Sequence, residues 1–262
     1  MSICTTNKAH PHFLCILYKN SKILILSTNL FLSIFKIIQN VQKMVHISFD
    51  KALNIWYNYY EVIRMIKCFY GGVLDSNAYL LYDGGEAMLI DCGVAPKKIC
   101  EFLRESSLKL KYIILTHGHF DHVEYSEEYE KLFPDAMVLC HKDEISVLRD
   151  PVANVTALFS AGRTYELSAH ALEGGERLFI GDTEVEIIHT PGHSVGGICI
   201  FCPKENAIFV GDTLFRNGYG RTDFKGGSMT LLRASLKLLF SLDGSIEVYS
   251  GHGPKTTIGQ ES

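Results

Sequence analysis

The sequence lacks the features that mark several non-globular and nucleic-acid-binding classes of protein. It has no heptad run and no self-similar period, which excludes coiled coils and short-period repeat proteins. Its formal net charge at pH 7 is only −4 and 47% of its 262 residues are hydrophobic, which excludes intrinsic disorder. A mildly acidic chain also gives no electrostatic reason to expect a nucleic-acid partner. We expect one large domain, or one domain with an appendage.

Residues 1–64 lack glycine and differ in charge from the rest of the chain. They carry a net charge of +5, whereas residues 65–262 carry −9. Their most apolar piece, residues 23–35, is short for a membrane-spanning helix and contains four polar residues, which disfavours a membrane anchor. It would suit the core of a signal peptide, but no small-residue cleavage site follows it. We expect residues 1–64 to be an N-terminal extension, either mistranslated or poorly ordered, and residues 65–262 to be the functional domain.

The eight cysteines do not form the compact framework of a disulfide-stapled fold. Cys199 and Cys202 form a C-x-x-C, but the motif lies in an apolar run typical of a strand and has no second pair with which to bind zinc. We therefore expect these cysteines to be structural and reduced, and the protein to be cytoplasmic.

Residues 65–262 alternate short apolar runs with amphipathic stretches, the pattern of an α/β fold with helices covering two packed sheets. Helices are predicted over 96–106, 142–148 and 228–240, another helix ends near Phe133, and residues 151–162 have few regular signals. The last helix has an apolar face that we assign to Leu231, Leu232, Leu236, Leu238 and Leu239. Strands are predicted over 77–82, 87–91, 112–115, 137–140, 184–188, 198–201, 207–210 and 247–249.

The most informative string is T-H-G-H-F-D-H, residues 116–122, which follows a predicted strand. It places four side chains that can bind a divalent metal within six residues: His117, His119, Asp121 and His122. Imidazole nitrogens and carboxylate oxygens are ligands for zinc and for iron. Scattered histidines would not show this spacing at a strand end, so we interpret the string as part of a metal site.

Three more ligand-type residues, His193, Asp212 and His252, each follow a predicted strand and have a glycine beside them. Together with the string this makes seven donors, too many for one tetrahedral ion. They suit two divalent ions about 3.5–4 Å apart that share a carboxylate. The remaining histidines of the domain lack such neighbours, and we expect His141 and His170 to be structural and His189 to pack near the site or support a ligand.

At these residues the chain resembles the metallo-β-lactamase-fold hydrolases. The resemblance implies a four-layer αββα sandwich over residues 65–262, with the metals at one edge of the two sheets. It implies that His117, His119 and His193 hold one metal, that Asp121, His122 and His252 hold the other, and that Asp212 bridges them.

Within that superfamily the chain is similar to the small bacterial glyoxalase II-like thioesterases, the hydroxyacylglutathione hydrolases. The similarity lies in Asp212 within G-D-T-L-F, residues 211–215, and in G-R-T-D, residues 220–223. It implies a dinuclear hydrolase in which metal-bound hydroxide attacks a small-molecule thioester such as S-lactoylglutathione. We expect zinc, with iron or manganese as alternatives, and catalytic roles for Asp121 and Asp212.

Several alternatives remain open at this point. Arg221 could meet a substrate carboxylate or pair with Asp223, and Tyr219 could form a pocket wall. The rival function is a persulfide dioxygenase of the same fold, which would hold one iron through His117, His193 and Asp212. A non-catalytic metal-binding module is the third reading, and the oligomeric state is left open.

Overall fold

The computed structural model describes residues 3–4, 13–18, 22–27 and 65–262, and the chain divides into two compact units, Met1–Arg64 and Met65–Ser262. In the first unit, β1 (Ile3–Cys4), β2 (Phe13–Tyr18) and β3 (Lys22–Ser27) form an antiparallel sheet in that order. The prediction of a mistranslated or poorly ordered extension concerns mostly residues outside the described ones, and it stays a prediction. No helix within the described ranges combines the length and the apolar character needed to cross a bilayer.

The second unit contains two six-stranded sheets. The first has the order β4-β5-β6-β7-β8-β9 and is antiparallel across its first three strands and parallel from β6 onward. Its parallel strands are joined by crossovers that carry helices, as parallel pairing requires. Its strands are Ile66–Phe69, Ala78–Asp83, Glu86–Ile90, Lys109–Ile114, Met137–His141 and His170–Leu172.

The second sheet has the order β10-β11-β12-β13-β16-β17 and is antiparallel except between β13 and β16. Its strands are Arg177–Ile180, Thr183–His189, Ile198–Cys202, Ala207–Gly211, Glu247–Ser250 and Thr256–Thr257. A small ribbon of β14 (Leu214–Phe215) and β15 (Gly218–Tyr219) follows β13.

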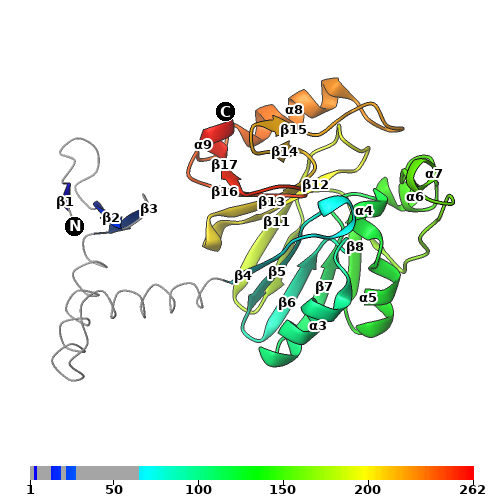
Figure 1. The fold of residues 1–262 in the computed structure, drawn as a ribbon, viewed down its shortest axis with the longest axis horizontal. Coiled ribbons are helices and arrows are strands. Elements are labelled where there is room, and N and C mark those ends of the chain that lie inside the picture. Colours follow the sequence, from blue (N-terminus) through cyan, green and yellow to red (C-terminus); the bar gives the residue numbers. More distant parts are fainter. Residues whose placement is uncertain (1–2, 5–12, 19–21, 28–64) are drawn as a thin grey trace. The chain divides into compact units, whose positions relative to one another are not determined.

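The helices lie on the outer faces of the two sheets, so the unit has the predicted four-layer αββα architecture (Figure 1). α3 (Pro96–Glu105) and α5 (Ser126–Leu132) cover the first sheet, and α8 (Met229–Leu239) covers the second. The shorter helices are η1 (Val73–Asp75), α4 (Phe120–Val123), α6 (Glu144–Leu148), α7 (Thr156–Phe159), η2 (Pro203–Glu205) and α9 (Ile258–Glu261).

Each sheet is buried on both faces. Successive side chains of a strand point to opposite faces, so one strand contributes side chains to two different clusters. Along β5, Leu80 packs into the cluster under α3, whereas Tyr79 and Leu81 pack into the cluster between the sheets. That inter-sheet cluster also contains Ile187 and Phe209 from the second sheet. This shared core fixes one sheet against the other and therefore fixes the relative positions of the loops at their edges.

Most predicted elements are confirmed, with three corrections. The helix predicted to end near Phe133 is two helices, α4 and α5, and the segment 151–162 contains the short helix α7. On α8, Leu231 and Leu238 are 46% and 45% exposed, so their assignment to the buried face was wrong. At 3.6 residues per turn they flank the stripe of Leu232, Leu236 and Leu239, which is buried. Cys199 and Cys202 are buried, free thiols in β12, as expected.

This difference on α8 predicts unequal effects of two neighbouring substitutions. Leu232→Ala removes a side chain that is 0% exposed and should lower the free energy of unfolding by about 2–5 kcal/mol. Leu231→Ala, on the exposed flank, should change it by less than about 0.5 kcal/mol. Urea denaturation followed by circular dichroism measures both values, and equal losses would contradict the packing described here.

Candidate metal centre

Four loops that follow strand ends converge at one edge of the two sheets. One loop follows β7 of the first sheet and carries residues 117–122. The other three follow β11, β13 and β16 of the second sheet and carry His193, Asp212 and His252. The structure brings all seven predicted ligand residues together in three overlapping groups of possible ligands.

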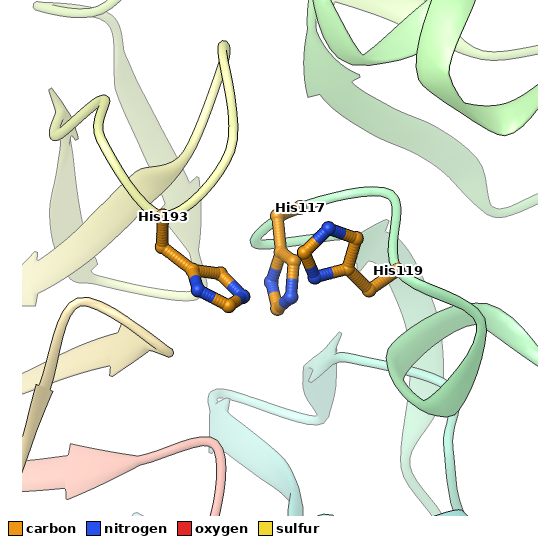
Figure 2. Close-up of side chains that lie close together, drawn as sticks. All are labelled: His117, His119 and His193. Atoms are coloured by element: carbon orange, nitrogen blue, oxygen red, sulfur yellow. The ribbon is translucent and has the colours of Figure 1, made fainter. Parts of the chain in front are cut away.

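The first group is His117, His119 and His193, whose ligand atoms lie within 4.8 Å of one another. Their rings come from two different loops and converge on one small space (Figure 2). The ring centroids are 4.6–4.9 Å apart and the rings are nearly perpendicular, so the contacts are not a parallel stack. Within the described part of the chain, the buried Nε2 atom of each ring has no hydrogen-bond partner. Three buried nitrogens that face one space without a donor fit a bound metal ion.

The second group is Asp121, His122 and His252, and a third group, His117, His122 and Asp212, shares a residue with each of the other two. The Nε2 atom of His252 lies 3.1 Å from Asp121 Oδ2 and 3.2 Å from His122 Nε2. Asp212 lies between the groups, because its Oδ1 is 3.3 Å from His122 Nε2 and its Oδ2 is 3.6 Å from His193 Nε2. The position of Asp212 therefore allows one carboxylate to reach both groups.

Burial keeps two of these histidines neutral. Desolvation, followed by the neighbouring imidazoles, holds the pKa of His117 well below its ordinary value. Desolvation likewise lowers the pKa of His119 to about 3. A neutral imidazole is the form that binds a metal ion, so these side chains need no deprotonation near pH 7 to act as ligands.

The carboxylates of the cluster are ionised and attract positive charge. Burial by itself raises the pKa of Asp212, but the adjacent His122 outweighs this effect and the pKa lies well below its usual value. Burial by itself lowers the pKa of His122, but Asp212 and Asp121 raise it well above the ordinary value. The cluster thus favours a cation at its centre.

Hydrogen bonds behind the cluster direct the imidazole nitrogens inward. His193 Nδ1 donates to the carbonyl of Arg221 at 2.8 Å, which leaves Nε2 with a free lone pair. His122 Nδ1 lies 2.8 Å from Asp91 Oδ2, and His117 Nδ1 lies 3.1 Å from Thr116 Oγ1. Such partners fix the tautomer and the orientation of metal-binding histidines.

Asp91 is a supporting residue that the sequence reasoning missed. It is 2% exposed and follows β6, and its carboxylate also accepts hydrogen bonds from the amide and hydroxyl of Thr116 at 2.7 and 2.8 Å. It thereby ties the first metal-binding loop to the neighbouring strand. Its φ of 61°, uncommon for a residue other than glycine, is the strained backbone often found at functional sites.

The cluster opens to solvent beside His252, whose side chain is 27% exposed, compared with 11% for Asp121 and Asp212. A groove of about 470 Å³ is lined by Tyr70, Gly71, Asp75, Asn77, Gly253, Pro254 and Lys255. Gly253 follows His252 in the sequence, whereas none of the seven ligand residues lines the groove.

The two predicted substrate-binding residues lie in the segment after Asp212. Arg221 forms a bidentate pair with Asp223, at 2.7 and 2.6 Å, and its guanidinium lies over the ring of Phe224. That ring contacts His119 edge-on, with centroids 5.7 Å apart. Tyr219, in β15, is 56% exposed. Of the two roles considered for Arg221, the structure shows the ion pair with Asp223.

The other histidines of the domain stay outside the ligand groups found among the described residues. His141 is buried and stacks on His189, with ring centroids 4.0 Å apart and planes at 10°. His170 is exposed on β9. The packing role expected for His141 and His189 matches this contact.

A two-sheet sandwich with a histidine and aspartate cluster at one edge is the architecture of a class of metal-dependent enzymes. Residues 71–252 match the sequence model of the metallo-beta-lactamase superfamily, and the chain belongs to this superfamily. It is 34% identical over 192 residues to the probable metallo-hydrolase YqgX of Bacillus subtilis, covering 71% of this chain and 89% of that protein. It is 30% identical over 193 residues to a hydroxyacylglutathione hydrolase of Francisella philomiragia, covering 72% and 68%.

Solved structures give the same fold. The B3 metallo-beta-lactamase BLEG-1 superposes with a TM-score of 0.69 at 37% identity, covering 75% of this chain and 95% of the other. TTHA1623, solved in a di-iron-bound form, gives 0.67 at 35% identity, covering 74% and 96%. ETHE1 from Myxococcus xanthus gives 0.61 at 25% identity, covering 74% and 80%.

The role of Asp91 can be tested with Asp91→Asn, because asparagine tolerates the same positive φ. The amide removes one acceptor and should weaken binding of a divalent metal by about 10–100-fold, as loss of such supporting partners does. Chelator competition measures the affinity. Asp83→Asn is the matched control, because Asp83 binds Thr183 and Lys204 at the hairpin end of β5. Equal affinity in both variants would contradict a supporting role.

Proposed function

We propose that the chain is a dinuclear-metal thioesterase that hydrolyses a small S-2-hydroxyacyl thiol such as S-lactoylglutathione. The observation that carries the proposal is the convergence of seven ligand-type side chains, three of them with buried Nε2 atoms that have no partner among the described residues. The name of the Francisella philomiragia relative supports the thioester class.

The residues fit two divalent ions. His117, His119 and His193 would hold one ion, and Asp121, His122 and His252 the other, with Asp212 reaching both. Nitrogen and oxygen ligands of this kind suit zinc, and also iron or manganese. We propose zinc, while the di-iron form of TTHA1623 supports iron as the alternative. When bound, such a pair of ions supplies a water of lowered pKa and polarises a carbonyl oxygen.

Asp121 is the side chain best placed to take the proton of the attacking water. Its pKa is held below the usual value, because His122 and His252 outweigh the effect of burial, so it is ionised near neutral pH. It also lies 3.1 Å from Nε2 of His252, whose side chain is 27% exposed. In the reaction the water oxygen bonds to the carbonyl carbon, the proton passes to Asp121, and the C–S bond breaks as the sulfur leaves as a thiolate. No dedicated acid is needed, because a thiolate is a good leaving group.

The groove that includes Gly253, next to His252, would take the substrate. Tyr219 does not line this groove, and its role as a pocket wall stays a prediction. Arg221 would meet a substrate carboxylate through its forked donors by exchanging its partner Asp223. The partner is thus a small molecule, and the net charge of −9 over residues 65–262 disfavours nucleic acid. The expected reduced cysteines are consistent with a cytoplasmic location.

A persulfide dioxygenase is the second candidate, favoured by the ETHE1 neighbour and by G-R-T-D-F at residues 220–224. It needs only His117, His193 and Asp212 to hold one iron. The second group would then have no role, yet Asp121, His122 and His252 lie within ligand distance of one another. This group is why we favour the hydrolase.

The function is tested by elemental analysis of the purified protein together with an S-lactoylglutathione assay. We expect two metal equivalents per chain and thioester hydrolysis, and His119→Ala should lower kcat/KM by more than about 100-fold, because a lost ligand costs more than a lost supporting residue. His170→Ala, a histidine outside the ligand groups, is the matched control and should keep the activity.

Two results would replace the proposal. One iron per chain with oxygen consumption on glutathione persulfide would identify a dioxygenase. Hydrolysis of a β-lactam without any thioester turnover would instead follow the neighbour BLEG-1.

Metal removal should also destabilise the protein. A ligand present at 100 times its Kd stabilises the native state by about 2.7 kcal/mol, so an excess of EDTA should lower the Tm by several degrees. Adding the metal back should restore it. Differential scanning calorimetry of wild type and His119→Ala separates this effect from nonspecific chelation, because the variant should respond less. A Tm unaffected by EDTA would count against a metal site that is populated during purification.

A further inference from the structure

Glu144, the first residue of α6, is a completely buried carboxylate that the reaction does not use. Its Oε2 accepts the amide hydrogen of Gly118 and its Oε1 accepts that of Gly196, both at 2.6 Å. Burial raises the pKa of this carboxyl group, while Ser194 and the two amides act against that rise. Each carboxyl oxygen thus holds the amide of a different loop at a short distance.

The two amides belong to the two loops that carry the first group of ligands. Gly118 stands between His117 and His119, in the loop after β7 of the first sheet. Gly196 comes three residues after His193, in the loop before β12 of the second sheet. The Glu144 side chain therefore links the two loops that carry the three imidazoles. Figure 2 shows these imidazoles converging from the two loops.

The junction is too tight for any residue larger than glycine. A Cβ atom at Gly118 would lie 2.9 Å from Glu144 Oε2. A Cβ atom at Gly196 would lie 2.6 Å from His141 Nδ1 and 3.0 Å from Glu144 Cγ. His141 in turn stacks on His189. The backbones of both loops thus lie against Glu144, and the backbone at Gly196 also lies against His141 of the stacked pair.

A carboxylate at this point can fix the distance between the two loops. Its two acceptor oxygens lie in one rigid plane, so they set the separation of the two amides that they bind. Each amide belongs to a residue that is one to three positions from a ligand. An apolar side chain could fill the volume but could not fix that distance, and it would leave two buried amides unpaired.

We propose that Glu144 is a positioning residue, which sets the spacing of the two histidine loops and so pre-organises the site of His117, His119 and His193 for its metal ion. The inference rests on the metal centre of the proposed function. It concerns how the site is held, so it does not depend on which substrate is hydrolysed.

The test is Glu144→Gln, which keeps the size of the side chain but turns an NH₂ group toward one of the two amide donors. We expect one of two metal equivalents to bind about 10–100-fold more weakly in a chelator competition with Zn²⁺. In the Co²⁺-loaded protein the visible absorption bands of that equivalent should shift, which a purely structural loss would not cause.

Glu86→Gln is the matched control. Glu86 also accepts a main-chain amide, that of Gly181 at 3.0 Å, together with Lys111 Nζ at 2.8 Å, but it does so at the opposite end of β6 from Asp91. It should keep both metal affinities and the Co²⁺ spectrum of the wild type.

The outcomes separate this inference from the proposed function. Wild-type protein that binds no Zn²⁺ would overturn the metal centre itself, and this inference with it. Wild type that binds two equivalents, with the same affinities and Co²⁺ bands in Glu144→Gln, would overturn the role of Glu144 alone. If Glu144→Gln does not fold, amide hydrogen exchange of the metal-free wild type decides. Protection of Gly118 and Gly196 before metal is added supports the inference, and protection only after metal addition overturns it.

Discussion

The convergence of seven ligand-type side chains, five of them buried, at one edge of the two sheets is the constraint on which the rest of the site depends. Buried carboxylates and imidazoles are costly unless they are paired. Here the Nε2 atoms of three imidazoles have no partner among the described residues, and Asp212 lies between the two groups of ligands. A divalent cation satisfies both kinds of group at once. The groups that make the metal-free cluster unfavourable are therefore the same groups that favour binding of a divalent cation.

The sandwich supplies the rigidity that this cluster needs. Ligands come from both sheets, and the inter-sheet core that includes Tyr79 and Phe209 holds the sheets in one relative position. Next to the cluster, Asp91 and Glu144 extend this control to single loops. Asp91 ties its loop to the end of β6, and Glu144 links the two loops that carry the three-histidine group. Apolar packing sets the coarse geometry, and buried carboxylates set the fine geometry.

The metal ligands and the groove beside His252 depend on different parts of the fold. The ligands lie on strand ends inside the conserved architecture of the sandwich, whereas the groove beside His252 is lined by loop residues such as Tyr70 and Lys255. Loops vary more than the elements that they connect, and one fold can carry sites for different substrates. This is why neighbours with different names superpose on this chain.

The sequence by itself predicted the layered α/β fold and the convergence of the seven ligands, because periodicity and local spacing carry that information. The H-x-H-x-D-H string and the glycine-flanked His193, Asp212 and His252 are short-range signals at strand ends. Only the tertiary structure showed that Asp91 supports His122 and that Glu144 joins Gly118 to Gly196. Those hydrogen bonds join residues that are 26–52 positions apart in the sequence. The residues around Asp91 and around Glu144 form no local pattern that would set these acids apart from other polar residues. Which acids are buried, and against which amides, is decided by how the two sheets pack.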